Sequence, residues 1–250
     1  MFNLSYNKMS MNQIFLNQQL YFYQIKYKKI LSIRLHLQTP NSFYISCPYF
    51  TSKRRIETFI RGQSNWIISN SKKLVVYPKL SQLKKIKILA KSYKIDLSRG
   101  RKNSFIFNPH KKTINIVAKS LCQQNLTKIY DKNFRPIALK IIRVEIDEIL
   151  HSSKHHILPY FAKKMNKISL RNQKSRFGSC SSKGNLSFNW QIIFFPPDKF
   201  RHIILHELVH LKIKNHSADF WGLLAQLDKK SKQNNKWLKK EAQKHFIIKA

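Results

Sequence analysis

Hydrophobic and polar positions alternate in short runs along the first half of the chain. Runs rich in β-branched and aromatic residues, separated by polar or proline-containing breaks, predict three strands at residues 20–27, 31–38 and 42–50. Residues 51–73 have apolar side chains near helical spacing, which favours a helix capped by Ser52. Residues 85–97 again favour a strand, and residues 104–119 favour a hairpin that turns at residues 108–111.

From about Leu126 the apolar spacing changes to the helical period. Residues 134–150 predict an amphipathic helix that runs on toward Pro159. Two strands, residues 167–172 and 185–196, are expected on either side of a polar loop. Two further helices are expected, one from Lys199 to about Lys214 after a capping Asp198 and one after a capping Ser217.

These elements predict an α+β fold. We expect an N-terminal extension at residues 1–17 and a β-rich N-terminal region at residues 18–125. Residues 126–250 are then expected to hold a helix packed on a short sheet. The change from strands to helices near residues 120–130 is the candidate boundary, and we find no internal repeats.

The segment HELVH, residues 206–210, lies on the helix predicted from Lys199. At 100° per residue, the apolar side chains of this predicted helix cover most of the helix circumference, which is typical of a buried helix. Burying a carboxylate and two imidazoles costs roughly several kcal/mol unless a partner satisfies them. A divalent metal is such a partner, because His206 and His210 are one turn apart on one face. Glu207 can then reach a water at the ion without ligating it.

A third ligand is needed, and two residues are candidates. On a continuous helix His216 would point away from the site, but Asn215 and the capping Ser217 predict that the helix stops and the chain turns back. Glu241, on a separate helix, is the carboxylate alternative, and we favour His216. Three protein ligands leave one position open, which is typical of catalytic Zn²⁺ with Glu207 as general base.

The overall composition indicates the cellular compartment and the possible partners. Cys47, Cys122 and Cys180 are scattered and odd in number, which favours a reducing compartment, and we expect a cytoplasmic location. No secretory signal or membrane-spanning run is evident, so we expect no membrane partner. The net charge of +37 suggests a nucleic-acid partner, although Lys, Asn and Ile are abundant throughout, as in an AT-rich genome.

Three segments together resemble a known family: RFGSCSSKGNLSFNW (176–190), HELVH (206–210) and NHSADFW (215–221). The chain looks like the YgjP-like metallopeptidases, a zincin group related to SprT-like and WLM-type proteases, over roughly residues 18–245. The resemblance implies a zincin-like region with His206, His210 and His216 as zinc ligands and Glu207 as the catalytic residue. Phe177 departs from the tryptophan usual in the family but keeps an aromatic ring.

The substrate is open at this stage. A peptide or protein is the leading expectation, and the strand LSFNWQIIFF (186–195) is a candidate edge onto which a peptide adds by β-pairing. The loop RFGSCSSKG (176–184) is either a structural turn, with Cys180 a buried filler, or an oxyanion-stabilising element using Arg176 or Ser179. The alternatives are a nucleic-acid-associated protease and a nucleotide phosphoanhydride hydrolase that use the same zinc site.

Overall fold

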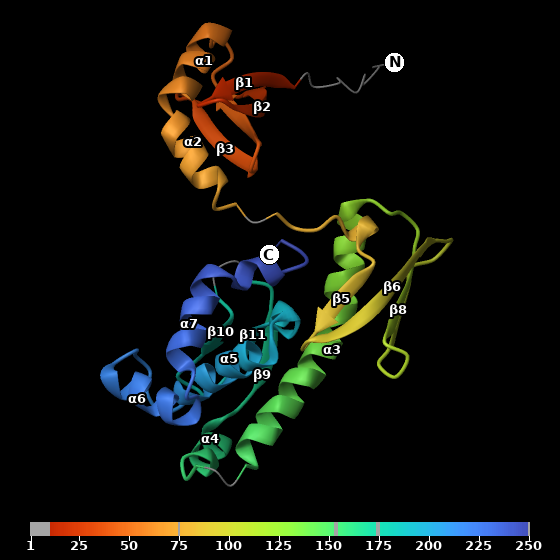
Figure 1. Ribbon diagram of the computed structural model, residues 1–250, viewed down its shortest axis with the longest axis vertical. Helices are drawn as coiled ribbons and strands as arrows, with labels where there is room; N and C mark the ends of the chain where they lie inside the picture. The colour runs from red at the N-terminus through yellow and green to blue at the C-terminus, as the bar shows by residue number, and fades with distance from the viewer. Residues whose placement is uncertain (1–10, 75, 153–154, 174–175, 250) are drawn as a thin grey trace. The chain divides into compact units, whose positions relative to one another are not determined.

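The computed structural model describes residues 11–74, 76–152, 155–173 and 176–249. The chain divides into two compact units between Val76 and Tyr77 (Figure 1). The sequence placed this division between residues 125 and 126. It lies earlier because Ile95 and Ile116, from the strands after Tyr77, share one hydrophobic core with the later helices. Residues 1–10 of the expected extension lie outside the described residues.

The first unit is a four-stranded sheet packed against two helices. The strands are β1 (Asn12–Leu16), β2 (Gln19–Tyr27), β3 (Arg34–Thr39) and β4 (Ser42–Cys47), in the order β1-β2-β4-β3. β1, within the expected extension, pairs with β2. The helix expected at residues 51–73 is two helices, α1 (Lys53–Gly62) and α2 (Ser64–Ser71), and the Oγ atom of Ser52 caps α1 by accepting from the Arg55 N–H.

The second unit begins with another four-stranded sheet. Its strands are β5 (Lys85–Ile88), β6 (Lys91–Arg99), β7 (Ser104–Asn108) and β8 (Thr113–Ala118), in the order β5-β6-β8-β7. The prediction of one strand over residues 85–97 was wrong, because the chain reverses at Leu89 and Ala90, which have φ angles of 44° and 67°. The hairpin predicted at residues 104–119 is confirmed.

The two sheets have the same topology, which the sequence did not reveal. Each consists of an antiparallel hairpin, a parallel pairing of the second and fourth strands, an antiparallel third strand and a following helix. The turn between β1 and β2 also has two residues with positive φ, Asn17 and Gln18. The expectation of no repeats is therefore wrong at the level of structure, because the shared pattern lies in burial and turn geometry.

The long helix α3 (Gln123–Leu150) follows the second sheet and supports the rest of the unit. It begins before the predicted residue 134, since Leu126 and Tyr130 are already buried in the core, and it contains Pro136. It ends before Pro159, and a separate helix, α4 (Leu158–Lys164), follows.

A small three-stranded sheet lies between α3 and the last helices (Figure 1). Its strands are β9 (Ile168–Arg171), β10 (Gly178–Cys180) and β11 (Leu186–Asn189), in the order β10-β11-β9. The strand expected at residues 185–196 stops at Asn189. There the Asn189 side chain accepts from the Gln191 N–H at 3.0 Å and starts a 3₁₀ helix, Trp190–Phe194. The last helices are α5 (Pro197–Val209), α6 (Ala218–Leu227) and α7 (Ser231–Lys240).

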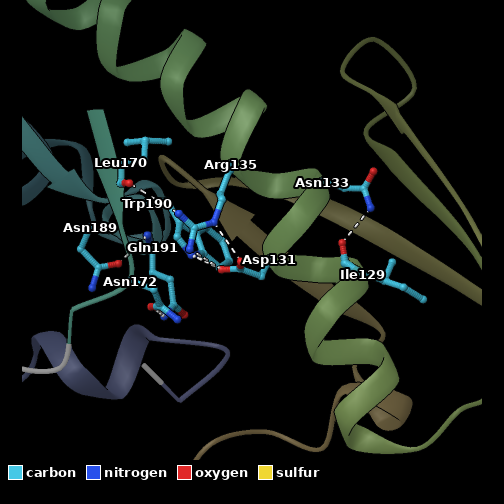
Figure 2. Close-up of polar contacts among 9 residues, drawn as sticks. All are labelled: Ile129, Asp131, Asn133, Arg135, Leu170, Asn172, Asn189, Trp190 and Gln191. Atoms are coloured by element: carbon cyan, nitrogen blue, oxygen red, sulfur yellow. Dashed lines mark hydrogen bonds and ion pairs between the residues drawn. The ribbon is translucent and has the colours of Figure 1, made fainter. Parts of the chain in front are cut away.

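A polar cluster joins α3 to this small sheet (Figure 2). Asp131 accepts from the Trp190 Nε1–H at 2.9 Å and from the Arg135 guanidinium at 2.9 and 3.1 Å. Trp190 is fully buried and stacks on Phe134. Because a buried indole N–H without an acceptor is costly, Asp131 fixes the end of β11 on α3. Within the described residues, no helix is both long and apolar enough to cross a membrane.

Candidate metal centre

The helix that carries HELVH is α5, and it is buried on most sides as the sequence predicted. It starts at Pro197, so Asp198 lies in the first turn and does not cap the helix. It ends at Val209, short of the predicted Lys214. The hydrogen bonding changes to the 3₁₀ type there: the N–H groups of Leu211 and Lys212 each donate to the carbonyl three residues back at 3.0 Å.

The early end of α5 returns the chain to the helix and brings three histidines together. The Nε2 atoms of His206 and His216 are 3.0 Å apart. The ring centroids are 4.9 Å apart for His206 and His210, 5.0 Å for His206 and His216, and 4.7 Å for His210 and His216. One nitrogen from each ring lies within 4.8 Å of the other two. The structure thus assembles the histidine set that the sequence favoured.

A hydrogen bond to the backbone fixes the orientation of the His210 ring. Its Nδ1 atom lies 2.9 Å from the carbonyl oxygen of Ile213, in the turn that follows α5. A ring that donates Nδ1–H to a carbonyl leaves Nε2 unprotonated and free to bind a cation. The turn therefore both positions His216 and selects the tautomer of His210.

One phenylalanine supports all three imidazoles, and the sequence analysis did not identify it as part of the site. Phe220, on α6, is fully buried, and its ring centroid lies 4.9, 4.5 and 4.7 Å from those of His206, His210 and His216. Its position four residues after His216, in the first turn of the next helix, is the signal that could have indicated this role. Ser217 stands at the N-terminus of α6 as expected, but its side chain makes no capping hydrogen bond.

Glu207 is buried beside the triad, and its carboxylate is held by packing. It is 4% exposed, and its Oε2 atom has no hydrogen-bond partner among the described residues. It packs against the backbone of Gly178 on β10, where a Cβ atom would lie 2.6 Å from both Cγ and Oε1 of Glu207. A glycine at position 178 is therefore required for the position of Glu207. This gives Gly178, in the segment 176–184, a structural function.

The other candidate ligands lie elsewhere. Glu241, at the C-terminal end of α7, bonds the Lys244 Nζ atom at 2.8 Å and is not part of the histidine cluster. Asp228 lies 2.6 Å from Nδ1 of His202, a histidine one turn before His206 on α5 that the sequence analysis did not single out. His202 is 1% exposed, and burial, partly opposed by Asp228, lowers its pKa. This pair ties α5 to the connection between α6 and α7.

The donor set fits a divalent metal ion. Two nitrogens bound to one zinc at about 2.05 Å with a tetrahedral angle lie about 3.3 Å apart, close to the observed 3.0 Å. Burial and the neighbouring His210 and His216 lower the pKa of His206 to about 3, so this ring is neutral, as a metal ligand must be. Burial raises the pKa of Glu207 to about 8, and only a nearby cation would favour its charged form at neutral pH.

The triad opens into a cavity of about 600 Å³. The segment from Arg176 to Cys180 lines this cavity, and Lys214 lines it beside the end of that segment. The Nζ atom of Lys214 donates to the carbonyl of Ser181 at 3.1 Å and lies 3.6 Å from Sγ of Cys180. Cys180 is half-buried at the cavity wall, and this burial raises the pKa of its thiol while Lys214 opposes the shift.

The sequence, compared with known protein families, matches one of them. The sequence description of the YgjP-like metallopeptidase domain matches residues 31–241. The chain belongs to this family. A comparison with curated proteins found no match. The matched range includes His206, His210, His216 and Glu207, and the three histidines form a cluster that could hold a metal ion.

Phe220 gives a first prediction. Phe220→Leu removes the ring that contacts all three imidazoles while keeping an apolar filler, so metal affinity should fall roughly 10- to 100-fold, as for other residues that orient ligands. Competition with a chromogenic chelator measures this. Leu224→Ala, on the same helix and equally buried, is the control and should lower stability with little change in affinity. Equal affinity losses in both variants would contradict the role of Phe220.

The burial of Glu207 gives a second prediction, for the metal-free protein. The pKa of Glu207 is about 8 in the folded chain and 4.5 without burial, so only the unfolded state ionises fully between these values, and stability falls as pH rises from 4.5 to 8. The Glu207→Gln variant has no titrating group at this position, so its stability does not fall for this reason. Its melting temperature should exceed that of the wild type by an amount that grows over this range, to on the order of 5 °C or more. Parallel curves in chelator-treated samples would contradict the prediction.

Proposed function

We propose that the protein is a zinc-dependent peptidase in which His206, His210 and His216 hold the ion and Glu207 is the general base. The observation that carries the proposal is the buried carboxyl group of Glu207, whose Oε2 atom has no hydrogen-bond partner among the described residues, beside three converging imidazoles at the wall of a cavity. Membership of a metallopeptidase family supports the same conclusion.

Zinc is the proposed metal because of the donor set. Three imidazole ligands without a thiolate suit zinc, and three protein ligands leave a position for water or substrate. When bound, the ion would polarise the scissile carbonyl and lower the pKa of a water molecule.

Glu207 is proposed to move the proton. Its carboxylate would accept a proton from the attacking water and later donate it to the leaving amine. Its position against Gly178 holds it in one place, so little reorganisation is needed between the two steps. Arg176 and Ser179 both line the cavity and are candidates to stabilise the negative charge that develops on the carbonyl oxygen.

The substrate edge proposed from the sequence needs a correction. β11 is the central strand of its sheet, paired with β10 in antiparallel and with β9 in parallel, so it offers no free edge. β10 is an edge strand of this sheet, and its residues Gly178–Cys180 line the cavity. We propose that an extended peptide pairs with β10, which would place its backbone beside Glu207.

A second reaction remains a candidate. Lys214 and Lys239 line the same cavity and could hold phosphates, which favours the nucleotide phosphoanhydride hydrolase as an alternative. A peptide or protein substrate is preferred because a strand edge borders the site. The nucleic-acid-associated form of the protease and a cytoplasmic location also stay predictions.

The ligand set yields a third prediction. The purified protein should carry about one zinc ion per chain, and His206→Ala or His210→Ala should abolish binding, since two imidazoles alone hold the ion poorly. His216→Ala should weaken binding sharply. Glu241→Gln is the control and should leave zinc content unchanged, because Glu241 bonds Lys244 outside the cluster. Metal analysis by mass spectrometry measures these contents, and full occupancy in a His206/His210 double variant would refute the site.

The base yields a fourth prediction. Glu207→Gln should retain zinc and lose turnover by roughly two to four orders of magnitude, because the water loses its proton acceptor. The assay compares an unfolded protein substrate with nucleoside triphosphates on the zinc-loaded protein. Cleavage of the protein substrate alone supports the peptidase, and phosphate release alone supports the alternative. Loss of zinc in Glu207→Gln would instead make this residue a ligand.

A further inference from the structure

The first unit presents a sheet face that its own helices leave open. One face carries Tyr21, Tyr23, Phe43 and Ile45, which form a core with α1 and α2. Figure 1 shows both helices on that side of the sheet. Because side chains alternate along a strand, the residues between these point to the opposite face.

The outer face combines aromatic rings with cations on neighbouring strands. Phe22 and Tyr44 stand on the central strands β2 and β4 and are only partly buried, and Phe15 on β1 is 62% exposed. Tyr44 stacks on His36 of β3 with centroids 4.5 Å apart, and the Lys26 Nζ atom lies 4.1 Å from the Tyr44 ring centroid.

A second cation flanks this row. Lys26 on β2 and Arg34 on β3 both lie opposite Ser46 of β4 in the pairing register, so they occupy one row beside Tyr44. Arg34 is exposed. The face thus offers planar rings next to two positive charges.

The second sheet is an internal control, because it has the same topology within the same chain. Aligning the turns and the parallel strand pairs places Lys87, Lys94 and Asn115 where the first sheet has Phe15, Phe22 and Tyr44. A genome bias toward lysine and asparagine acts on both sheets alike. The aromatic outer face of the first sheet is therefore not explained by composition.

Charge indicates the kind of partner. Among residues 11–76 the only acidic side chain is Glu57, which contacts Tyr23 and Lys53. The basic side chains in the same range are Lys26, Lys28, Lys29, Arg34, Lys53, Arg54, Arg55, Arg61, Lys72 and Lys73. A second copy of this unit would be repelled, whereas a polyanion would be attracted.

We propose that the outer face of the first sheet binds single-stranded nucleic acid. Bases would stack on Phe22 and on the Tyr44 and His36 pair, and phosphates would lie beside Lys26 and Arg34. Rings on the central strands of an open sheet with cations alongside are the features that bind unpaired bases without sequence preference. A duplex would bind less well, because its bases are already stacked. The proposal does not depend on the metal centre, and it is tested without metal.

The test measures binding by fluorescence anisotropy on the full, chelator-treated chain. The probes are labelled oligothymidylate and oligouridylate of about 12 nucleotides and a DNA duplex of equal length. Both single strands should bind more tightly than the duplex. Tyr44→Leu and Phe22→Leu, which keep apolar bulk, should each weaken binding by about tenfold, and Tyr44→Phe should bind like the wild type.

A matched charge control separates this face from the general positive charge of the protein. Lys26→Glu with Arg34→Glu should weaken binding by about tenfold or more, and Lys85→Glu with Lys87→Glu, the same charge change on the exposed face of β5, should have a much smaller effect. Equal losses in the two double variants would show diffuse electrostatic binding and overturn the proposal. Unchanged affinity in both leucine variants, or tighter binding of the duplex, would also overturn it. Circular dichroism checks that each variant is folded.

Discussion

The burial of a carboxyl group and imidazoles on α5 is the constraint on which the rest of the second unit depends. Glu207 has no hydrogen-bond partner for one oxygen among the described residues, and its pKa is raised to about 8 by burial alone. Replacing such a group by an apolar side chain would stabilise the folded protein, so stability alone does not explain its presence. The three imidazoles beside it offer nitrogen ligands for a cation, and a bound cation would compensate the charge of the ionised carboxylate.

The surrounding elements follow from this constraint. β10 approaches α5 closely enough that only a glycine fits against Glu207, and α6 places Phe220 behind all three imidazoles. β10 is in turn positioned by β11, which the Trp190 and Asp131 contact anchors on α3. A site of a few residues thus accounts for why a short sheet, a long helix and two later helices meet where they do.

Much of this site could be predicted from the sequence because it is local. The i and i+4 spacing of His206 and His210 requires only a helix. Asn215 and Ser217 predicted that this helix ends before His216, although it already ends at Val209. The role of Gly178 could not be predicted, since it depends on packing between β10 and α5, and Phe220 had only its position four residues after His216 to indicate its role. The boundary near residue 126 and the absence of repeats were misjudged for a related reason: the two four-stranded sheets share topology and burial but few residue types.

The three histidines and Glu207 all lie within residues 206–216, whereas Gly178 belongs to a strand that precedes α5. Closing so short a loop costs little entropy, and local contacts form early in folding. A metal ion that binds these histidines would therefore favour every conformation in which α5 and its turn are formed, whether or not the small sheet is assembled. Formation of the proposed metal centre would then depend on α5, its turn and Phe220, whereas confinement of the Glu207 carboxylate would also require β10 to be in place.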